Sequence, residues 1–267
     1  MSYAYESSAA DFLELASEQR LAIIQKLLVK RSKLSLLAKE LNAAPSEVFR
    51  NLERLETAGM IMKDTSGYFQ LTTCGSIICS SLIPTLSFVT QNKKYFKDHD
   101  FGEIPQKFIQ RIGALATGQF VNGFTKVIEK WKDIFETANE YISGILVEEP
   151  IEVIEPLVNK AKKGVKVNSI FSESTIIPKK RNQILQKYGV PDLIKKGVIE
   201  RKMRKDVKVV VVLNEKEACV MFPTKTGEPD ISKMFFGNEE IFHEWCLDYF
   251  RYWWYGSGHF QEGKLKE

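Results

Sequence analysis

The chain has few of the residues that metal sites and disulfide frameworks need. Its 267 residues include four cysteines and three histidines. Cys74, Cys79, Cys219 and Cys246 show no Cys-x-x-Cys spacing, and no set of His, Cys and carboxylate residues stands at the spacing of metal ligands. We therefore expect reduced, mostly buried thiols, no metal and no cofactor.

Long hydrophobic runs and a basic leader are also missing. No stretch of 18 apolar residues occurs, and the N-terminus carries Glu6 and Asp11 in place of a basic segment followed by an apolar one. We expect a cytoplasmic protein without a membrane-spanning segment and without a membrane as partner.

Two frequent catalytic motifs, the Walker phosphate-binding loop and the Gly-x-Ser-x-Gly nucleophile turn, do not occur. The composition is typical of a globular protein, with 44% hydrophobic and 27% charged residues. The length suffices for two domains. The formal net charge of +4 suits a polyanionic partner but is equally common in proteins that have none.

The most informative segment is 34–73, which begins with two short amphipathic helices. Ser35 can cap a first helix that ends near Leu41, and Pro45 suits the first turn of the next helix, where its missing N–H is not needed. Two helices therefore meet across a three- or four-residue turn.

The second helix, 45–58, has a core face and a solvent face. Val48, Leu52 and Leu55 recur at i, i+4 and i+7, so they should be buried. The residues that this pattern turns toward solvent are Ser46, Glu47, Arg50, Asn51 and Arg54.

A short hairpin should follow the second helix. Gly59 suits the position after the last helical residue, and the turn cluster 63–67 precedes the alternating strand pattern 68–71. This order of elements predicts a winged helix-turn-helix over residues 1–75, a fold that usually holds a DNA double helix. A long helix, 9–30, should pack beneath it. Its expected buried residues are Phe12, Leu13, Leu15, Ala16, Ile23, Ile24, Leu27 and Leu28.

The charge of this segment is modest. Between Ile24 and Lys63 we count eight basic and four acidic residues, a net charge of +4, but the second helix itself is not basic. Because phosphate contacts supply most non-specific affinity, a monomer should bind DNA weakly, and specific binding would need two copies on one duplex.

Residues 76–106 are assigned to a dimerisation helix and a linker. A helix over 74–97 has a wide apolar side, and Pro84 should kink it. Either the second domain or a twofold partner could cover that side, and we favour the partner. The sequence 99–105 then breaks the helical pattern.

From about Lys107 helices alternate with β-branched strands, which predicts an α/β domain over 107–267 and an α+β protein overall. The expected strands are 141–147, 165–171, 198–203, 207–213 and 218–222. The expected helices are 124–139, 151–163, 179–188 and 239–255. The alternation predicts a mostly parallel sheet, and a turn at 214–217 adds an antiparallel pair near one edge, so the sheet should be mixed.

Residues 178–208 carry the strongest charge bias, eleven basic residues against three acidic ones. A solvated lysine-rich face explains this, and so would an anionic effector site or an accessory track for DNA phosphates. For an effector, we expect Arg201 and Arg204 to be the contacts, because a guanidinium can hold an anion through two hydrogen bonds.

An aromatic stripe runs along the final helix. Such a stripe is usually core, although residues at its edge could line a small-molecule cavity. Its members are Ile241, Phe242, Trp245, Cys246, Tyr249, Phe250, Trp253 and Trp254.

The N-terminal segment resembles the winged-helix transcription regulators of bacteria and archaea. The matching residues are Pro45, Ser46, Val48, Arg50, Leu52, Leu55, Glu56, Ala58, Gly59, Ile61, Gly67, Tyr68, Leu71, Thr72 and Gly75. The resemblance implies that one flank of the second helix faces the major groove and that one wing residue lies near the DNA backbone. These residues are Ser46, Arg50, Asn51 and Arg54 on the helix and Lys63 on the wing. Two residues depart from the family pattern, in which small hydroxylated residues are more usual: Glu47 and Phe49.

With a winged helix before it, the second half resembles the sensor domain of an archaeal regulator family, similar to regulators of sugar metabolism or methanogenesis. That domain has a phospholipase-D-like fold without the enzyme's chemistry. The segment 108–113, the order of strands and the aromatic C-terminal helix carry this resemblance. A phospholipase-D site needs paired His-x-Lys motifs, and none of His99, His243 and His259 heads one. We expect no enzymatic activity.

The sequence therefore predicts a homodimeric transcription regulator that binds double-stranded DNA. The resemblance adds a small-molecule effector, bound by residues 107–267. The alternative is a non-catalytic adaptor whose winged helix binds protein.

Overall fold

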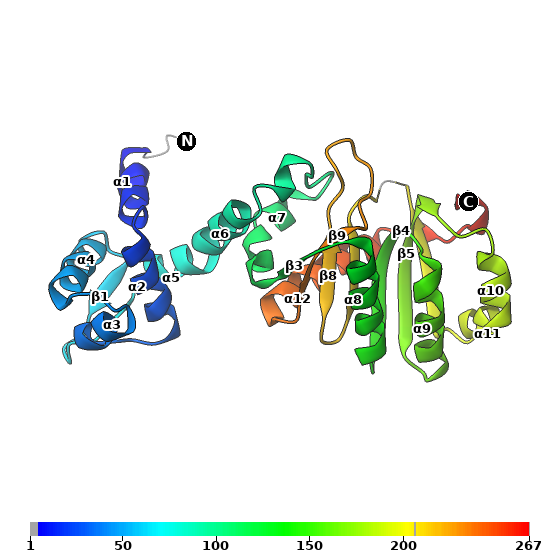
Figure 1. Cartoon of the computed structure of the whole chain (residues 1–267), viewed down its shortest axis with the longest axis horizontal. Helices are drawn as coiled ribbons and strands as arrows, with labels where there is room; N and C mark the ends of the chain where they lie inside the picture. Colours follow the sequence, from blue (N-terminus) through cyan, green and yellow to red (C-terminus); the bar gives the residue numbers. More distant parts are fainter. Residues whose placement is uncertain (1–4, 206, 267) are drawn as a thin grey trace. The chain divides into compact units, whose positions relative to one another are not determined.

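The computed structural model describes residues 5–205 and 207–266. The chain forms two compact units, Met1–Leu86 and Ser87–Glu267 (Figure 1). The division therefore falls inside the segment 76–106 that the sequence assigns to a dimerisation helix and linker.

The first unit begins with four helices and a hairpin. The helices are α1 (Tyr5–Leu15), α2 (Glu18–Val29), α3 (Leu34–Glu40) and α4 (Pro45–Thr57), and the strands are β1 (Ile61–Lys63) and β2 (Phe69–Leu71). The core lies between α2, α3, α4 and the hairpin, and it contains Val48, Leu52 and Leu55 as expected, each completely buried. Gly59, with φ of 69°, follows the end of α4 in the left-handed conformation that glycine adopts without strain.

The expected helix 9–30 is broken into α1 and α2. The backbone of Ser17 is extended, and its hydroxyl oxygen accepts a hydrogen bond from the Arg20 N–H at 3.4 Å, so it caps α2. The prediction that Phe12, Leu13 and Leu28 are buried is wrong, because they are 55%, 67% and 48% exposed. Ala16 is exposed as well. The break at Ser17 separates α1 from the face that α2 buries, and the apolar periodicity alone does not show it.

A mostly apolar helical run follows the hairpin. It consists of α5 (Thr73–Ile77), a π-helical turn η1 (Ile78–Leu82) and α6 (Ile83–Gln91). The π turn ends two residues before Pro84, whose missing N–H and ring disturb regular helical bonding. Gly75 of α5 lies so close to the hairpin that a Cβ there would be 1.9 Å from the Met60 carbonyl oxygen.

The run Thr73–Gln91 has 19 residues and a mean hydropathy of 1.4, and only 17% of it is buried. By length and composition it could cross a membrane, so the expectation that no segment could do so is not confirmed. Ile77 and Leu86 are 61% and 58% exposed on this run. The wide apolar side that the sequence indicates is therefore largely uncovered at these two residues.

The second unit is built on a sheet of eight strands in the order β10-β6-β5-β4-β7-β8-β9-β3. The strands are β3 (Gln119–Asn122), β4 (Tyr141–Glu148), β5 (Lys166–Ile176), β6 (Ile199–Arg204), β7 (Val210–Asn214), β8 (Ala218–Met221), β9 (Lys233–Gly237) and β10 (Gly258–His259). The two pairs β4–β5 and β5–β6 are parallel, and the other five neighbouring pairs are antiparallel. The sheet is mixed as expected. The expectation of a mostly parallel sheet is wrong, because β7 runs antiparallel to β4 and because the unexpected short strands β3, β9 and β10 all pair antiparallel.

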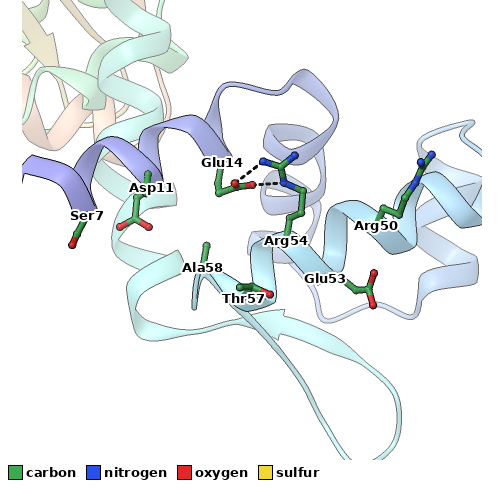
Figure 2. A pocket seen from close by; sticks show the side chains of 9 residues that line it. Ser7, Asp11, Glu14, Arg50, Glu53, Arg54, Thr57 and Ala58 are labelled. Atoms are coloured by element: carbon green, nitrogen blue, oxygen red, sulfur yellow. Dashed lines mark hydrogen bonds and ion pairs between the residues drawn. The ribbon is translucent and has the colours of Figure 1, made fainter.

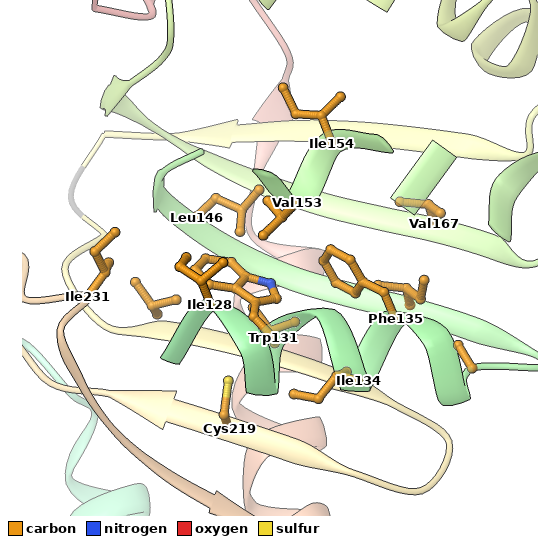
Figure 3. Close-up of a cluster of buried hydrophobic side chains, with 14 of the residues drawn as sticks. Ile128, Trp131, Ile134, Phe135, Leu146, Val153, Ile154, Val167, Cys219 and Ile231 are labelled. Atoms are coloured by element: carbon orange, nitrogen blue, oxygen red, sulfur yellow. The ribbon is translucent and has the colours of Figure 1, made fainter. Parts of the chain in front are cut away.

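Helices cover both faces of this sheet. They are α7 (Gln106–Ile109), α8 (Phe124–Thr137), α9 (Ile151–Lys162), α10 (Arg181–Lys187), α11 (Val190–Lys195) and α12 (Glu240–Tyr255), with 3-10 turns η2 (Tyr95–Lys97), η3 (Ile112–Thr117) and η4 (Glu262–Lys264). On one face, Trp131 and Phe135 of α8 pack with Leu146 of β4 and Val153 of α9, as Figure 3 shows. The unit is therefore an α/β/α sandwich.

The other face is covered by α12 and η3. Trp245 of α12 stacks on Tyr249 with ring centroids 5.4 Å apart, and its indole N–H donates to the Phe108 carbonyl oxygen at 3.1 Å. Most of the aromatic stripe is thus core, as the sequence indicates. The buried residues of this stripe are Phe242, Trp245, Cys246, Tyr249 and Phe250.

The expected linker 99–105 belongs to this second core. His99 and Ile104 are 2% and 6% exposed, and Ile104 packs in the same cluster as Tyr95 and Phe108. The loss of helical periodicity here reflects an irregular segment that lies against the sheet. It does not mark a free connection between domains.

The cysteines are distributed as expected, since all four are unpaired and three are buried. Cys74 is the exposed one. Burial raises the pKa of the Cys79 thiol to about 11 and that of Cys219 to about 12. These buried thiols are correspondingly unreactive near neutral pH.

A buried polar contact fixes the segment that contains His99. The imidazole stacks on Tyr95 at 4.0 Å, and its Nε2 atom lies 2.8 Å from a carboxylate oxygen of Asp230. Burial of Asp230 alone would raise its pKa, but hydrogen bonds from Ser232, His99 and Lys233 outweigh burial and hold that pKa well below its usual range. The folded chain therefore releases the Asp230 proton more readily than the unfolded chain.

Asp230→Asn should remove a pH-dependent part of the stability. An unfolded aspartate has a pKa of about 3.9, so the contribution is complete above roughly pH 5 and is lost progressively as the pH falls toward the lower pKa of Asp230 in the folded chain. The urea-unfolding free energies of the wild type and the variant should differ most at pH 7, and the difference should be smaller at pH 3. Asp248→Asn, which breaks an exposed pair with Arg111, is the matched control and should change stability little. A wild-type advantage that is unchanged at pH 3 would contradict this assignment.

Candidate nucleic-acid interface

One flank of α4 faces solvent because the opposite flank forms the core. Ser46 and Arg50 on this flank are exposed. Within residues 5–205 and 207–266, the Arg50 guanidinium has no hydrogen-bond or ion-pair partner. Of the α4 residues proposed as DNA contacts, these two have side chains that are free to meet a ligand.

Asn51, by contrast, is engaged within the unit. Its amide oxygen accepts a hydrogen bond from Arg20 Nη1 at 3.3 Å, and its amide nitrogen donates to Gln19 Oε1 and to the Glu47 carbonyl oxygen, the latter at 3.2 Å. Arg20 is itself 7% exposed and donates to backbone carbonyl oxygens of Leu13 and Glu14. Asn51 therefore ties α4 to the junction of α1 and α2.

Arg54 is held by a carboxylate of α1. Its Nε and Nη2 atoms donate to the two carboxylate oxygens of Glu14 at 2.8 and 2.7 Å, as the dashed lines in Figure 2 show. The hydrogen bond from Arg54 lowers the pKa of Glu14, and the same bond raises the pKa of Arg54. The Arg54 side chain is still 56% exposed, but it is paired with Glu14, whose carboxylate also lies 3.4 Å from Arg20 Nε.

A groove of about 700 Å³ lies between α1 and α4. Asp11 and Glu14 line it from α1, and Arg50, Glu53 and Arg54 line it from α4 (Figure 2). Helix α1 contains three acidic residues and no basic one. An acidic helix thus lies beside the arginine-bearing flank of α4.

The hairpin and the residues before α3 form a second exposed group of cations. Ser32 pairs with Phe69 of β2 through two backbone hydrogen bonds of 3.0 and 2.9 Å, which places Arg31 and Lys33 beside the β1–β2 hairpin. Both lie over the ring of Tyr68, at 4.8 and 4.9 Å from its centroid.

On the hairpin itself, Lys63 of β1 is exposed, and its ammonium group lies 5.5 Å from the centroid of the Phe69 ring. Arg31 also donates to Asp64 at 3.1 Å, and hydrogen bonds from the Tyr68 and Ser66 backbone and from Arg31 lower the pKa of Asp64. The sequence identifies Lys63 as a wing residue but gives no position for Arg31 and Lys33. Their basic run before α3 is the one signal that could have pointed to them.

In the second unit the structure does not bring Arg201 and Arg204 together. They are three residues apart on β6, so their side chains point to opposite faces of the sheet. Arg201 lies over the Phe260 ring at 4.1 Å, and Arg204 lies over the Trp253 ring at 4.0 Å. Arg204 also donates to the Gly256 carbonyl oxygen at 3.0 Å.

The three histidines lie in separate places. His99 is buried against Asp230, whereas His243 contacts the Asn214 carbonyl oxygen at the end of β7, at 2.6 Å, and His259 is exposed on β10. Four strand spacings of about 4.8 Å separate β10 from β7, so His243 and His259 are on the order of 19 Å apart across the sheet. No pair of them is placed to share a phosphate.

Neither a family model nor a curated protein matches this sequence. Among solved structures, TrmBL2, described as an archaeal chromatin protein with a novel mode of DNA binding, is similar over 97% of this chain and 100% of its own, with 11% identity and a TM-score of 0.41. Nuc from Salmonella typhimurium, a phospholipase D family member, is similar over 54% of this chain and 98% of its own, with 13% identity and a TM-score of 0.40. IdeR of T. acidophilum is similar over 82% of this chain and 97% of its own, with 13% identity and a TM-score of 0.25.

Proposed function

We propose that the chain is a cytoplasmic, homodimeric transcription regulator that binds specific sequences of double-stranded DNA through a winged helix-turn-helix in its first unit. The observation that supports this most is the exposed flank of α4, with the unpartnered Arg50, on the same unit as the wing cations. A helix that enters the major groove needs such a flank, and a wing beside it needs cations for the phosphates.

In this proposal α4 lies in the major groove. Arg50 contacts a guanine edge or a phosphate, and the hydroxyl of Ser46 adds a polar contact. Lys63 touches the DNA backbone from the wing, together with Lys33 beside it. Arg31 adds a phosphate contact only after its hydrogen bond to Asp64 opens. Asn51 and Arg54 contribute only after their present hydrogen bonds open.

The small number of free cations makes a second copy part of the proposal. We infer that the exposed apolar side of α5, η1 and α6, including Ile77 and Leu86, packs against the same surface of a twofold-related copy. Such a pairing would present two α4 helices to one duplex and would double the number of phosphate contacts.

An effector bound by the second unit would act by changing the separation of the two α4 helices. For this it must bind one arrangement of the dimer more tightly than the other. Because Arg201 and Arg204 point to opposite faces of β6, a small effector bound on one face of the sheet would contact only one of these two arginines.

A second candidate function is protein docking, and exposed apolar residues favour it. Phe49 of α4, Met62 of β1 and Leu36 of α3 are 44%, 45% and 38% exposed. Apolar side chains of this size suit a protein surface better than a phosphate backbone. In this function the first unit is the docking module of a non-catalytic adaptor.

Arg50→Ala should weaken DNA binding more than Arg54→Ala, because the charge of Arg54 is already balanced by Glu14. Loss of a guanine contact costs about 1–3 kcal/mol, and loss of a phosphate contact lowers the salt dependence by about one counterion. Fluorescence anisotropy or mobility shift against pooled genomic fragments at two salt concentrations measures both. Arg111→Ala, an exposed arginine of the second unit, is the control. If no fragment is retained even at low salt, and a partner protein is recovered in a pull-down, the adaptor is the correct function.

Glu14→Gln should strengthen DNA binding by releasing Arg54. The change removes a carboxylate that competes with DNA phosphates, so affinity should rise and its salt dependence should become steeper by about one counterion. Glu6→Gln makes the same charge change on α1 at a residue outside the groove, so it isolates the effect of the Arg54 contact. Equal affinities for the two variants would show that Glu14 does not restrain Arg54 in DNA binding.

Ile77→Glu or Leu86→Glu should dissociate the dimer, because a buried unpaired carboxylate is costly at an apolar interface. Light scattering after size exclusion should then give the monomer mass of 30.6 kDa where the wild type gives twice that value. Val29→Glu places the same charge at an apolar residue of α2 that is 83% exposed, and it should leave the mass unchanged. A wild-type chain that is monomeric at micromolar concentration would refute this interface.

A further inference from the structure

Two arginines of the second unit converge on one carboxylate near the C-terminus. Arg181 of α10 donates from Nη1 to Oε1 of Glu262, and Arg201 of β6 donates from Nη1 to Oε2 of the same residue at 3.3 Å. The three residues come from three separate elements, α10, β6 and η4. One oxyanion with two oxygens is thus held between two guanidinium groups.

The arginine side of this arrangement is rigidly built. Arg181 is 1% exposed, its Nε atom donates to a carboxylate oxygen of Glu149, and its guanidinium lies 5.5 Å from the centroid of the Phe171 ring. Arg201 lies over Phe260 at 4.1 Å, and the two phenylalanine rings are 5.1 Å apart. Two packed aromatic rings therefore hold both guanidinium groups in place. Because these side chains are already ordered, they lose little conformational entropy when an anion binds.

The carboxylate side is much less fixed. The Glu262 side chain is 40% exposed and stands on a three-residue 3-10 turn. Beyond it, the segment is attached to the end of β5 by the Lys264–Glu173 ion pair of 2.6 Å and by backbone hydrogen bonds of Lys266 with Thr175 and Ile177, at 2.9 and 2.8 Å. The exposed part of the site is therefore the part that a ligand could replace.

Charge makes replacement by an anion favourable. Glu149, 6% exposed, balances one of the two guanidinium groups, so the site without Glu262 carries a net charge of +1. The surrounding segment 178–208 contains eleven basic and three acidic residues, which favours the approach of anions.

Space for a ligand adjoins Arg201. A cavity of about 610 Å³ lies along the edge of β6, lined by Glu200, Arg201, His259 and Phe260 among others. This edge is open because β10 pairs with β6 only at Lys202 and Met203. A molecule that enters the cavity reaches the Arg201 guanidinium directly.

We propose that Arg181 and Arg201 form an oxyanion-binding site, and that Glu262 fills it as an internal stand-in which a small molecule with a carboxylate or phosphate monoester group displaces. The proposal does not depend on DNA binding. The proposed anion-binding pair is Arg181 and Arg201, in place of the expected pair Arg201 and Arg204. When the ligand binds, the C-terminal segment that carries Glu262 is the part of the chain that moves.

Anion binding by the full-length Glu262→Gln variant tests the site. Inorganic phosphate and acetate are titrated separately by calorimetry at constant ionic strength, with chloride as the reference anion. Because the internal competitor is gone, we expect saturable binding at least about tenfold tighter than in the wild type, equivalent to roughly 1.4 kcal/mol. Preference for phosphate identifies a phosphate monoester as the ligand group, and equal or better binding of acetate identifies a carboxylate.

Two further variants in the Glu262→Gln background assign the binding to this site. Adding Arg201→Gln should abolish it, whereas adding Arg111→Gln, which removes an exposed arginine paired with Asp248, should leave it unchanged. A folded Glu262→Gln chain that binds neither anion beyond chloride overturns the proposal, and so does binding that survives Arg201→Gln.

Hydrogen exchange in the wild type gives an independent test that needs no variant. Displacement of Glu262 should loosen the segment behind it, so the backbone N–H groups of Ile177 and Lys266 should exchange faster at saturating phosphate or acetate than in chloride. Unchanged exchange at both amides, with either anion, would show that the carboxylate is a permanent part of the fold.

Discussion

The orientation of α4 about its own axis is the constraint on which the proposed DNA contacts depend. Val48, Leu52 and Leu55 can be buried in only one rotation of the helix, and that rotation determines which residues point outward. The free energy of burying these side chains, about 1.5–3 kcal/mol each, far exceeds what any single exposed contact contributes. The same packing that stabilises the unit therefore also places Arg50 at the surface.

Electrostatics modifies this arrangement without changing the fold. Glu14 is paired with Arg54, and Asp64 is paired with Arg31, so two of the cations near α4 and the β1–β2 hairpin already have carboxylate partners. Exposed pairs of this kind contribute little to stability. Their larger effect is on binding, because a phosphate must compete with a carboxylate that is covalently part of the same chain. The second unit repeats this situation at Arg181 and Arg201, where Glu262 is the carboxylate.

The local pattern of apolar and polar residues predicts most helices and strands of this protein. The remaining elements depend on contacts with residues that are distant in the sequence. The boundaries of α4, α8, α9 and α12 follow from apolar periodicity, since each long helix buries one stripe. The strands β3 and β10 have four and two residues, too few for an alternating pattern to be recognised. The expectation of a mostly parallel sheet failed for a different reason, because the direction of a strand such as β7 depends on its connections and not on its own residues.

The candidate site was predictable to a similar extent. The solvent flank of α4 follows from the core positions, but the bonds of Asn51 and Arg54 come from α1 and α2, which no pattern within α4 reveals. Arg181 lies in a lysine-rich segment whose composition suggests a solvated surface, yet it is buried because Glu149 and Phe171 happen to face it. The opposite orientation of Arg201 and Arg204, in contrast, follows from the two-residue period of a strand and needs only the correct assignment of β6.

The uneven exposure of the cysteines makes the native chain convenient for spectroscopy. Cys74 lies in the first turn of α5, within the apolar run Thr73–Gln91 that is proposed to pair, while the other three thiols are buried. A nitroxide or fluorophore with a maleimide group would therefore attach at one known position without any mutation. In a twofold assembly the two labels would report the spacing of the protomers, and any rearrangement of the subunits would appear as a change in a single measured distribution of distances.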